Sequence, residues 1–211
     1  MSDNTLLFKL KKFERADFEI ITDIVEPHSK VLDLGCGDGR LLRKLMDRKH
    51  VRATGIEISE EGVQACVEKG LSVMQADIDE GLSDYPDKYF DYVILSHTLH
   101  AVKRPRNLVK ELIRVGKTAI VSFPNFGYFM VRFRFLWHGR MPYSSEFPFP
   151  WYDSPNIHIC TIRDFKDFCA GESIEIIRQV YLGSFEQKGI TPFPNFFAKV
   201  GIFQISDKGK R

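Results

Sequence analysis

The sequence lacks the features that mark a secreted or membrane-inserted protein. No stretch approaches the roughly 18 apolar residues that a membrane-spanning helix needs. The first twenty residues have no apolar segment of signal-peptide length and carry acidic residues throughout. The four cysteines, Cys36, Cys66, Cys160 and Cys169, form no CxxC pair and have no metal-like spacing with histidines. We therefore expect reduced thiols, no metal site and a cytoplasmic location.

Strong charge and several well-known site motifs are also absent. The net charge of +2 is small and the Lys and Arg residues are dispersed, which predicts no nucleic-acid partner. The phosphate-binding pattern GxxxxGK[ST] does not occur, and the dinucleotide pattern GxGxxG fails because Arg40 stands where its last glycine would be. No Ser/His/Asp set, HExxH or NPPY-type motif is present. The sequence thus argues for a ligand site more strongly than for a catalytic one.

What the sequence does contain is an alternation of short apolar strands with helices of about ten residues. Strands are expected at 30–35, 51–58, 71–76, 89–96, 117–123, 173–183 and 196–206, and helices at 39–49, 59–70, 104–116 and 161–171, after a helical spacing over 13–25. Ser59 is the expected N-cap and Gly70 the expected C-cap of one helix. This rhythm predicts a single α/β domain over residues 1–211 with a mainly parallel sheet, ending in an antiparallel pair.

An aromatic-rich insertion at about 123–160 interrupts the rhythm. Residues 123–152 hold twelve of the 27 aromatic residues, and Arg132, Arg134 and Arg140 are interspersed among them. Such a composition is enriched at protein-binding surfaces, which is the interpretation we favour. A lid or substrate pocket, and core packing, are the alternatives. Insertion into a membrane surface is weaker, because the arginines interrupt the apolar run.

The stretch VLDLGCGDGRLL at 31–42 is the expected ligand site, because in open α/β sheets ligands bind beyond the carboxyl end of the first strand. Its spacing is GxGxG, and Asp33 precedes it, which suits an ammonium-bearing ligand better than a pyrophosphate. The next strand ends in Glu57, whose carboxylate can accept both hydroxyls of a ribose. Asp77 follows the third strand and could bond an adenine amino group, although a turn or helix-capping aspartate fits its spacing nearly as well.

These stretches resemble a known set of motifs. DLGCGDG, GIEIS, QADI and FDYVILSHTL are similar, in order, to the motifs of class I S-adenosylmethionine-dependent methyltransferases. The resemblance implies a Rossmann-like, mostly parallel seven-stranded sheet with an antiparallel final hairpin and helices on both faces. It implies S-adenosylmethionine or S-adenosylhomocysteine as cofactor. The implied cofactor-binding residues are Asp33, Gly35, Cys36, Gly37, Gly39, Glu57, Ile58, Asp77, Ile78 and Ser96.

The downstream half narrows the resemblance. SFPNFGYFMVRFRFLWHGRMP, WYDSPNIHICTIRDF and PNFFAKVGIFQI are similar to the methionine biosynthesis protein MetW family. This implies a domain that supports homoserine O-acylation in methionine biosynthesis together with the homoserine O-acyltransferase MetX. The alternatives are a methyltransferase acting on a small molecule, and a partner protein whose cofactor site is vestigial.

Three histidines are weak candidates for a catalytic base. His97 and His100 follow the fourth predicted strand, where a histidine that shapes the pocket wall or caps the next helix is the more common situation. His158 lies beyond the aromatic segment and could face the ligand, or pack against Tyr152. A base is required only for a weak nucleophile, because much of the rate of methyl transfer can come from positioning.

Overall fold

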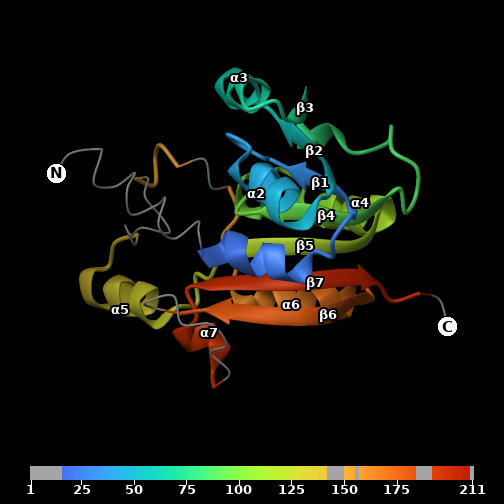
Figure 1. Ribbon diagram of the computed structural model, residues 1–211. Coiled ribbons are helices and arrows are strands. Elements are labelled where there is room, and N and C mark those ends of the chain that lie inside the picture. Colours follow the sequence, from blue (N-terminus) through green and yellow to red (C-terminus); the bar gives the residue numbers. More distant parts are fainter. Residues whose placement is uncertain (1–15, 142–149, 155–156, 184–191, 210–211) are drawn as a thin grey trace.

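The computed structural model describes residues 16–141, 150–154, 157–183 and 192–209. These residues build one seven-stranded sheet with flanking helices (Figure 1). The strands are β1 (Lys30–Leu34), β2 (Arg52–Glu57), β3 (Ser72–Gln75), β4 (Phe90–Ser96), β5 (Gly116–Pro124), β6 (Ile174–Leu182) and β7 (Val200–Asp207). The helices are residues 16–24, α2 (Arg40–Lys49), α3 (Glu60–Glu68), η1 (Ile78–Glu80), η2 (Leu99–Ala101), α4 (Pro105–Val115), α5 (Phe129–His138), α6 (Ile162–Gly171) and α7 (Pro194–Phe197).

The strand order is β3-β2-β1-β4-β5-β7-β6. The first five strands in this order pair in parallel, whereas β7 runs antiparallel to both β5 and β6. The expected mostly parallel sheet with an antiparallel final hairpin is therefore confirmed. From β1 the chain adds strands toward one side of the sheet, and from β4 it adds them toward the other side. The loops that follow β1 and β4 are therefore neighbours at the carboxyl edge of the sheet.

Alternate residues of the central strands pack on opposite faces of the sheet. In β4, Val93 and Leu95 belong to a core with α4 and α6, whereas Tyr92 and Ile94 belong to a second core with α2 and residues 16–24. This alternation follows from the period of two in a strand. Both faces are covered by helices, which explains why β1, β4 and β5 read as continuous apolar runs.

Two local predictions differ from the structure, and one lies partly outside the described residues. The helix at 59–70 has the expected N-cap, since Ser59 accepts a hydrogen bond from the Gly62 N–H, but Lys69 is the C-cap and Gly70 follows it at φ 69°. The last strand was expected from Phe196 and begins at Val200, because Pro194 opens the short helix α7. The early helical spacing began at residue 13, which lies outside the described residues.

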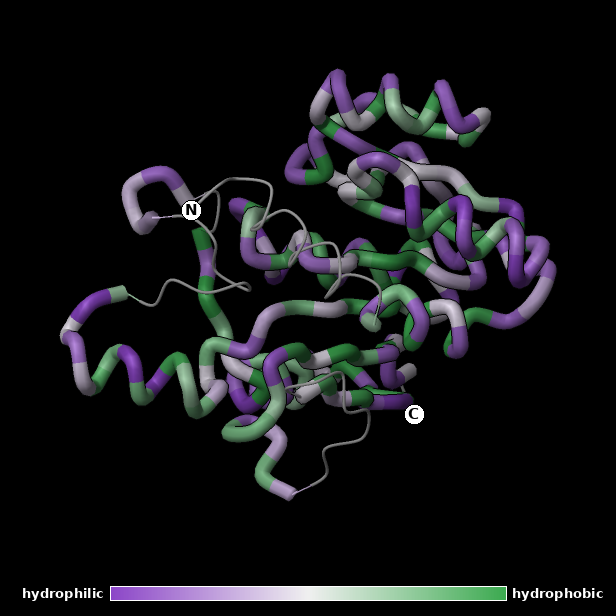
Figure 2. The backbone as a smooth tube through the Cα atoms, turned by 60° about the vertical axis from the view of Figure 1, so that its left-hand side comes forward, coloured by the Kyte–Doolittle hydropathy of each residue, from purple (hydrophilic) through white to green (hydrophobic). Residues whose placement is uncertain are grey.

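Helix α5 was not expected as regular structure, and most of its residues are exposed. It projects from one end of the molecule, beside α7 (Figure 1; Figure 2). Its base is fixed: Val131 is buried, the Arg132 Nε–H donates to the Gly127 carbonyl over 2.6 Å, and the Phe129 and Phe196 rings stack at 5.7 Å. The aromatic segment is thus partly an ordered helix, while residues 142–149 lie outside the described part of the chain.

Candidate functional site

The loop between β1 and α2 has a backbone that only glycine adopts easily. Gly35, Gly37 and Gly39 have φ values of 71°, 54° and 74°. A Cβ at Gly35 would lie 2.8 Å from the Thr98 Oγ1, and one at Gly39 would overlap the Leu71 and Cys66 side chains. Two of the three glycines are therefore required by close packing as well as by backbone conformation.

Glu57 ties this loop to the next one. Glu57 is 8% exposed, and its Oε2 accepts the Gly37 N–H at 2.8 Å. Oε1 accepts the N–H groups of Ile58 and Ser59, at 3.0 and 2.9 Å. Three backbone donors therefore hold Glu57 at the end of β2, with acceptor capacity left over for a ligand hydroxyl.

The loops after β1, β2, β3 and β4 enclose a cavity of about 410 Å³, here called the loop cavity. Seven predicted residues line it: Gly35, Glu57, Ile58, Asp77, Ile78, His97 and His100. The predicted residues outside its lining are Asp33, Cys36, Gly37, Gly39, Ser96 and His158. The structure therefore brings the four motif regions together at one cavity, with several of their residues standing behind its wall.

Sequence analysis missed other lining residues: Ile56, Ala76, Asp79, Thr98, Ala101, Val102 and Lys103. Thr98 backs Gly35 and its hydroxyl donates to the Ser96 carbonyl at 3.0 Å. The Asp79 carboxylate accepts the Lys103 N–H at 2.9 Å and so closes the far side of the cavity. Most of these residues follow β3 or β4, so the rule that sites lie beyond strand ends could have indicated them.

Asp77 caps a short helix as well as lining the loop cavity. Its Oδ1 accepts the Asp79 N–H at 2.9 Å, which opens η1. Its Oδ2 lies 3.7 Å from the Lys103 Nζ. Both interpretations of this aspartate are therefore compatible with its position, because a capping carboxylate keeps free acceptor sites.

Asp33 is buried, at 2% exposure, in acidic surroundings. Burial first, and then the neighbouring carboxylates of Glu57 and Asp17, raise the pKa of Asp33 to about 7. Such a site favours a ligand that brings positive charge.

We expect this raised pKa to govern how stability changes with pH. The folded-state pKa of Asp33 exceeds its ordinary 3.8. The contribution of Asp33 to the free energy of unfolding is therefore intact below about pH 4 and is lost as the pH rises through 7. Asp33→Asn removes this penalty. The free energy of unfolding of the ligand-free variant, relative to wild type, should therefore rise by about 3 kcal/mol between pH 5 and pH 8. Urea denaturation of both proteins measures it, and parallel pH profiles would contradict it.

The candidate histidines occupy different positions. His97 has a φ of 52°, and its Nε2 lies 3.5 Å from the Asp17 Oδ2. Burial, together with His97, lowers the pKa of His100 to about 4, so His100 is neutral near pH 7. His158 stands behind His100, with its backbone N–H donating to the His100 carbonyl at 2.9 Å. A neutral His100 can accept a proton, but in the described structure its buried Nδ1 has no partner to orient it.

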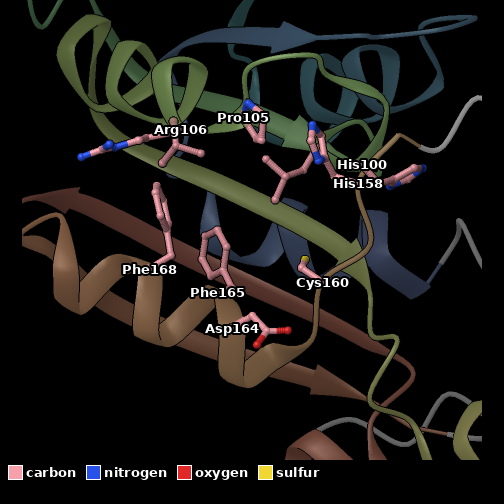
Figure 3. A pocket seen from close by; sticks show the side chains of 10 residues that line it. His100, Pro105, Arg106, His158, Cys160, Asp164, Phe165 and Phe168 are labelled. Carbon is pink, nitrogen blue, oxygen red and sulfur yellow. The ribbon is translucent and has the colours of Figure 1, made fainter.

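A second cavity, here called the apolar cavity, adjoins the first. It has a volume of about 230 Å³ and lies between η2, the start of α4 and α6. Figure 3 shows Phe165 and Phe168 extending from α6 toward Pro105, with His100 and His158 at the other end. His100 lines both cavities. The two spaces are therefore neighbours that share one polar wall residue.

Further observations concern sulfur, metal and membrane chemistry. All four cysteines are free thiols, and the sulfurs of Cys36 and Cys66 lie 3.9 Å apart. Within the described residues, no cluster of three His, Cys, Asp or Glu side chains is placed to hold a metal ion. No helix in that part of the chain is long and apolar enough to cross a membrane.

Solved structures resemble this fold. A S-adenosylmethionine-dependent methyltransferase from Archaeoglobus fulgidus matches with a TM-score of 0.70 at 16% identity, over 96% of this chain and 99% of its own. Another such methyltransferase, from Thermotoga maritima, matches with a TM-score of 0.69 at 16% identity, over 97% of this chain and 94% of its own. The fold is that of class I S-adenosylmethionine-dependent methyltransferases.

Sequence comparison is more specific. The bifunctional methionine biosynthesis protein MetXA/MetW of Rhodopirellula baltica is 38% identical over 197 residues, which cover 88% of this chain and 32% of that protein. The chain spans about a third of the length of the curated relatives it matches. The family profile described as methionine biosynthesis protein MetW matches residues 15–205. The chain belongs to the MetW family.

Proposed function

We propose that this chain binds S-adenosylmethionine or S-adenosylhomocysteine in the loop cavity and supports homoserine O-acylation by an acyltransferase of the MetX type. The observation that supports binding of this ligand is that buried carboxylates and positive-φ glycines lie together at one edge of the sheet. Methionine biosynthesis is the role for which the family is named.

The residues of the loop cavity fit this ligand. Gly35 lines the cavity without a side chain, and Glu57 keeps acceptor sites for ribose hydroxyls. Asp77 would accept a hydrogen bond from the adenine amino group. The ligand would supply positive charge through its ammonium group and, in the methylated form, its sulfonium.

A dinucleotide fits this edge less well. Its pyrophosphate would be placed at the start of α2, close to the loop that Glu57 holds. The 2%-exposed Asp33 and the 8%-exposed Glu57 would repel that negative charge in surroundings with little water. Isothermal titration calorimetry with S-adenosylmethionine, S-adenosylhomocysteine and NAD tests this half of the proposal. Binding of the first two is expected, and failure of both to bind would overturn it.

Two observations support the proposed association with an acyltransferase: the Rhodopirellula baltica relative and helix α5. The Rhodopirellula baltica protein carries MetXA and MetW in one name, and the aligned part is about a third of it. On α5, a stripe of apolar side chains at helical spacing is exposed to solvent: Met130, Phe133, Leu136 and Trp137. We call this the α5 stripe and propose that the acyltransferase covers it.

The geometry of the α5 stripe suits a docking surface. Leu136 is 82% exposed and Trp137 73%, whereas Val131 and Tyr128 anchor the helix from the opposite side. The Phe133 and Trp137 rings stack at 5.6 Å, which limits their freedom before binding. Preorganised aromatic side chains lose little conformational entropy on association and are typical interface anchors. Size-exclusion chromatography of the mixed proteins should show co-elution, and separate elution would contradict the partner half.

A second candidate function is methyl transfer to a small molecule. The observation that favours it is the apolar cavity, which shares His100 with the loop cavity. An acceptor held there would lie next to the ligand, and a neutral His100 could take its proton. Product formation that His100→Ala abolishes, with cofactor binding intact, would establish this function.

A further inference from the structure

The apolar cavity has walls that are fixed from behind. Phe165, on α6, is 3% exposed, and its ring lies 5.0 Å from that of Phe123 and 4.8 Å from that of Phe203. At the other end of the cavity, the His100 carbonyl accepts the backbone N–H of Ile157 at 2.8 Å. Side chains that are packed and hydrogen-bonded in this way do not move in to fill the space between them. The cavity is therefore a preformed feature of the fold.

The surface that faces this space is almost wholly apolar. Its apolar residues are Leu99, Pro105, Val109, Phe165 and Phe168. The Phe165 and Phe168 rings lie 6.2 Å apart on α6 and extend toward Pro105 (Figure 3). An apolar molecule between these walls would remove both its own surface and theirs from water, which is favourable.

The two permanently charged residues of the lining are engaged elsewhere. The Arg106 guanidinium lies 2.7 Å from the Glu172 carboxylate, and Figure 3 shows it extending away from Phe165. The Asp164 Oδ2 accepts the Thr161 N–H at 2.9 Å, at the start of α6. Both side chains therefore have partners outside the cavity, and neither is placed to pair with a charged ligand inside it.

The buried titratable groups of the lining are uncharged near neutral pH. Burial first, and then the Asp164 carboxylate, raise the pKa of the Cys160 thiol to about 12. The pKa of His100 is lowered to about 4, again mainly by burial. His158, the remaining titratable residue, is exposed to solvent. A charged ligand would therefore lose its hydration in this cavity without gaining a buried partner of opposite charge.

The volume of the apolar cavity, about 230 Å³, sets the size of its occupant. An apolar cavity of roughly 150 Å³ is large enough to bind benzene. The pockets that hold drug-sized ligands begin at about 300 Å³. A single aromatic ring with one or two small substituents therefore fits this space.

We propose that the apolar cavity is a second ligand site, separate from the loop cavity, and that it takes an uncharged, mainly apolar molecule about the size of one aromatic ring. The site does not depend on the function proposed above, because the two cavities share His100 alone among their lining residues. Its consequence for methyl transfer does rest on that second candidate function: the acceptor would be an uncharged ring compound bound beside His100.

Fluorine NMR with probes that share one ring and differ in charge tests the class of ligand. At pH 7, 4-fluorophenol is uncharged, 4-fluorobenzoate is an anion and 4-fluorobenzylamine is a cation. The full-length chain should bind 4-fluorophenol at least about tenfold more tightly than either charged probe, because burying an unpaired charge is costly. Equal or tighter binding of a charged probe would overturn the proposal, as would failure of 4-fluorophenol to bind at millimolar concentrations.

Variants of the lining locate the bound probe. Phe168→Ala removes part of the wall and should weaken binding of 4-fluorophenol by about tenfold, since roughly 50 Å² of apolar contact is lost. Val109→Phe fills the space from α4 and should abolish binding. The control is Phe197→Ala: Phe197 is 42% exposed and lies outside the lining, so its replacement should leave the affinity within about twofold of wild type. If Val109→Phe does not fold, Phe168→Ala decides, and an unchanged affinity in that variant would overturn the assignment.

Saturating S-adenosylhomocysteine separates this proposal from the proposed function. It should leave 4-fluorophenol bound, whereas displacement would place the probe in the loop cavity and overturn the proposal. A chain that binds S-adenosylhomocysteine but not 4-fluorophenol would keep the proposed ligand site and lose the second one. A chain that binds 4-fluorophenol but not S-adenosylhomocysteine would support the second site and refute the loop cavity as a nucleoside site.

Discussion

Replacing Glu57 by alanine should reduce the affinity for S-adenosylhomocysteine by at least about tenfold, and by more as the two loops loosen. The ribose hydroxyls lose a charged acceptor, which costs roughly 1.5–3 kcal/mol. The N–H groups of Gly37, Ile58 and Ser59 also lose their acceptor, so the glycine loop is no longer tied to β2. Calorimetry with S-adenosylhomocysteine and with 5′-methylthioadenosine measures the effect, and both ligands should be affected because both contain the ribose.

The control for Glu57 is Glu61→Ala. Glu61 is an exposed glutamate in the first turn of α3, a few residues along the same chain segment. It should leave both affinities unchanged. Equal affinities in wild type and Glu57→Ala would show that the ligand does not contact the end of β2, and would remove the basis for the loop cavity as its site.

Replacing Trp137 by serine should reduce the affinity for the acyltransferase by about 30-fold or more. Buried aromatic anchors at interfaces typically contribute 2 kcal/mol or more when truncated. Trp137 is 73% exposed and its ring stacks on that of Phe133, so the folding of the free chain should change little. Surface plasmon resonance with the immobilised acyltransferase measures the loss, and thermal denaturation confirms that the variant is folded.

Trp151→Ser is the matched control for this prediction. Trp151 is 76% exposed and also contacts a neighbouring aromatic ring, but it lies outside α5. It should leave binding of the acyltransferase within about twofold of wild type. A loss with Trp151→Ser and full binding with Trp137→Ser would place the interface elsewhere and contradict the assignment of the α5 stripe.

The parts of the fold that local patterns determine could be predicted. The β1 loop was visible because three glycines at alternate positions have few other uses, and Glu57 because it ends an apolar strand. Both faces of β4 and β5 are buried, so these strands read as continuous apolar runs and could be recognised without an alternating pattern. Helix α5 was missed because its apolar residues are not confined to one face that packs on the core: Leu136 and Phe135 are both exposed. Exposed apolar residues on more than one side of a helix give no single-face pattern to recognise.

The parts of the site that depend on distant residues could not be predicted. Asp17 reaches Ser122 across 105 positions of the chain, and no local spacing connects the two. The apolar cavity lies where α6 packs beside α4. His100 and Phe165, which are far apart in the sequence, both line it. Asp33 was assigned to an ammonium group from its place before the glycines; the structure buries it outside the lining of the loop cavity, and its role stays a prediction. Sequence reasoning predicted the edge of the sheet at which the loop cavity lies, and the structure added further residues that line it.

The most direct test of the proposed function is the rate of homoserine O-acylation. The acyltransferase from the same source is purified and assayed with and without this chain. We expect strong activation by the wild-type chain, and little by Trp137→Ser. An unchanged rate with the wild-type chain, together with separate elution of the two proteins, would contradict the account and leave methyl transfer to a small molecule as the function to test.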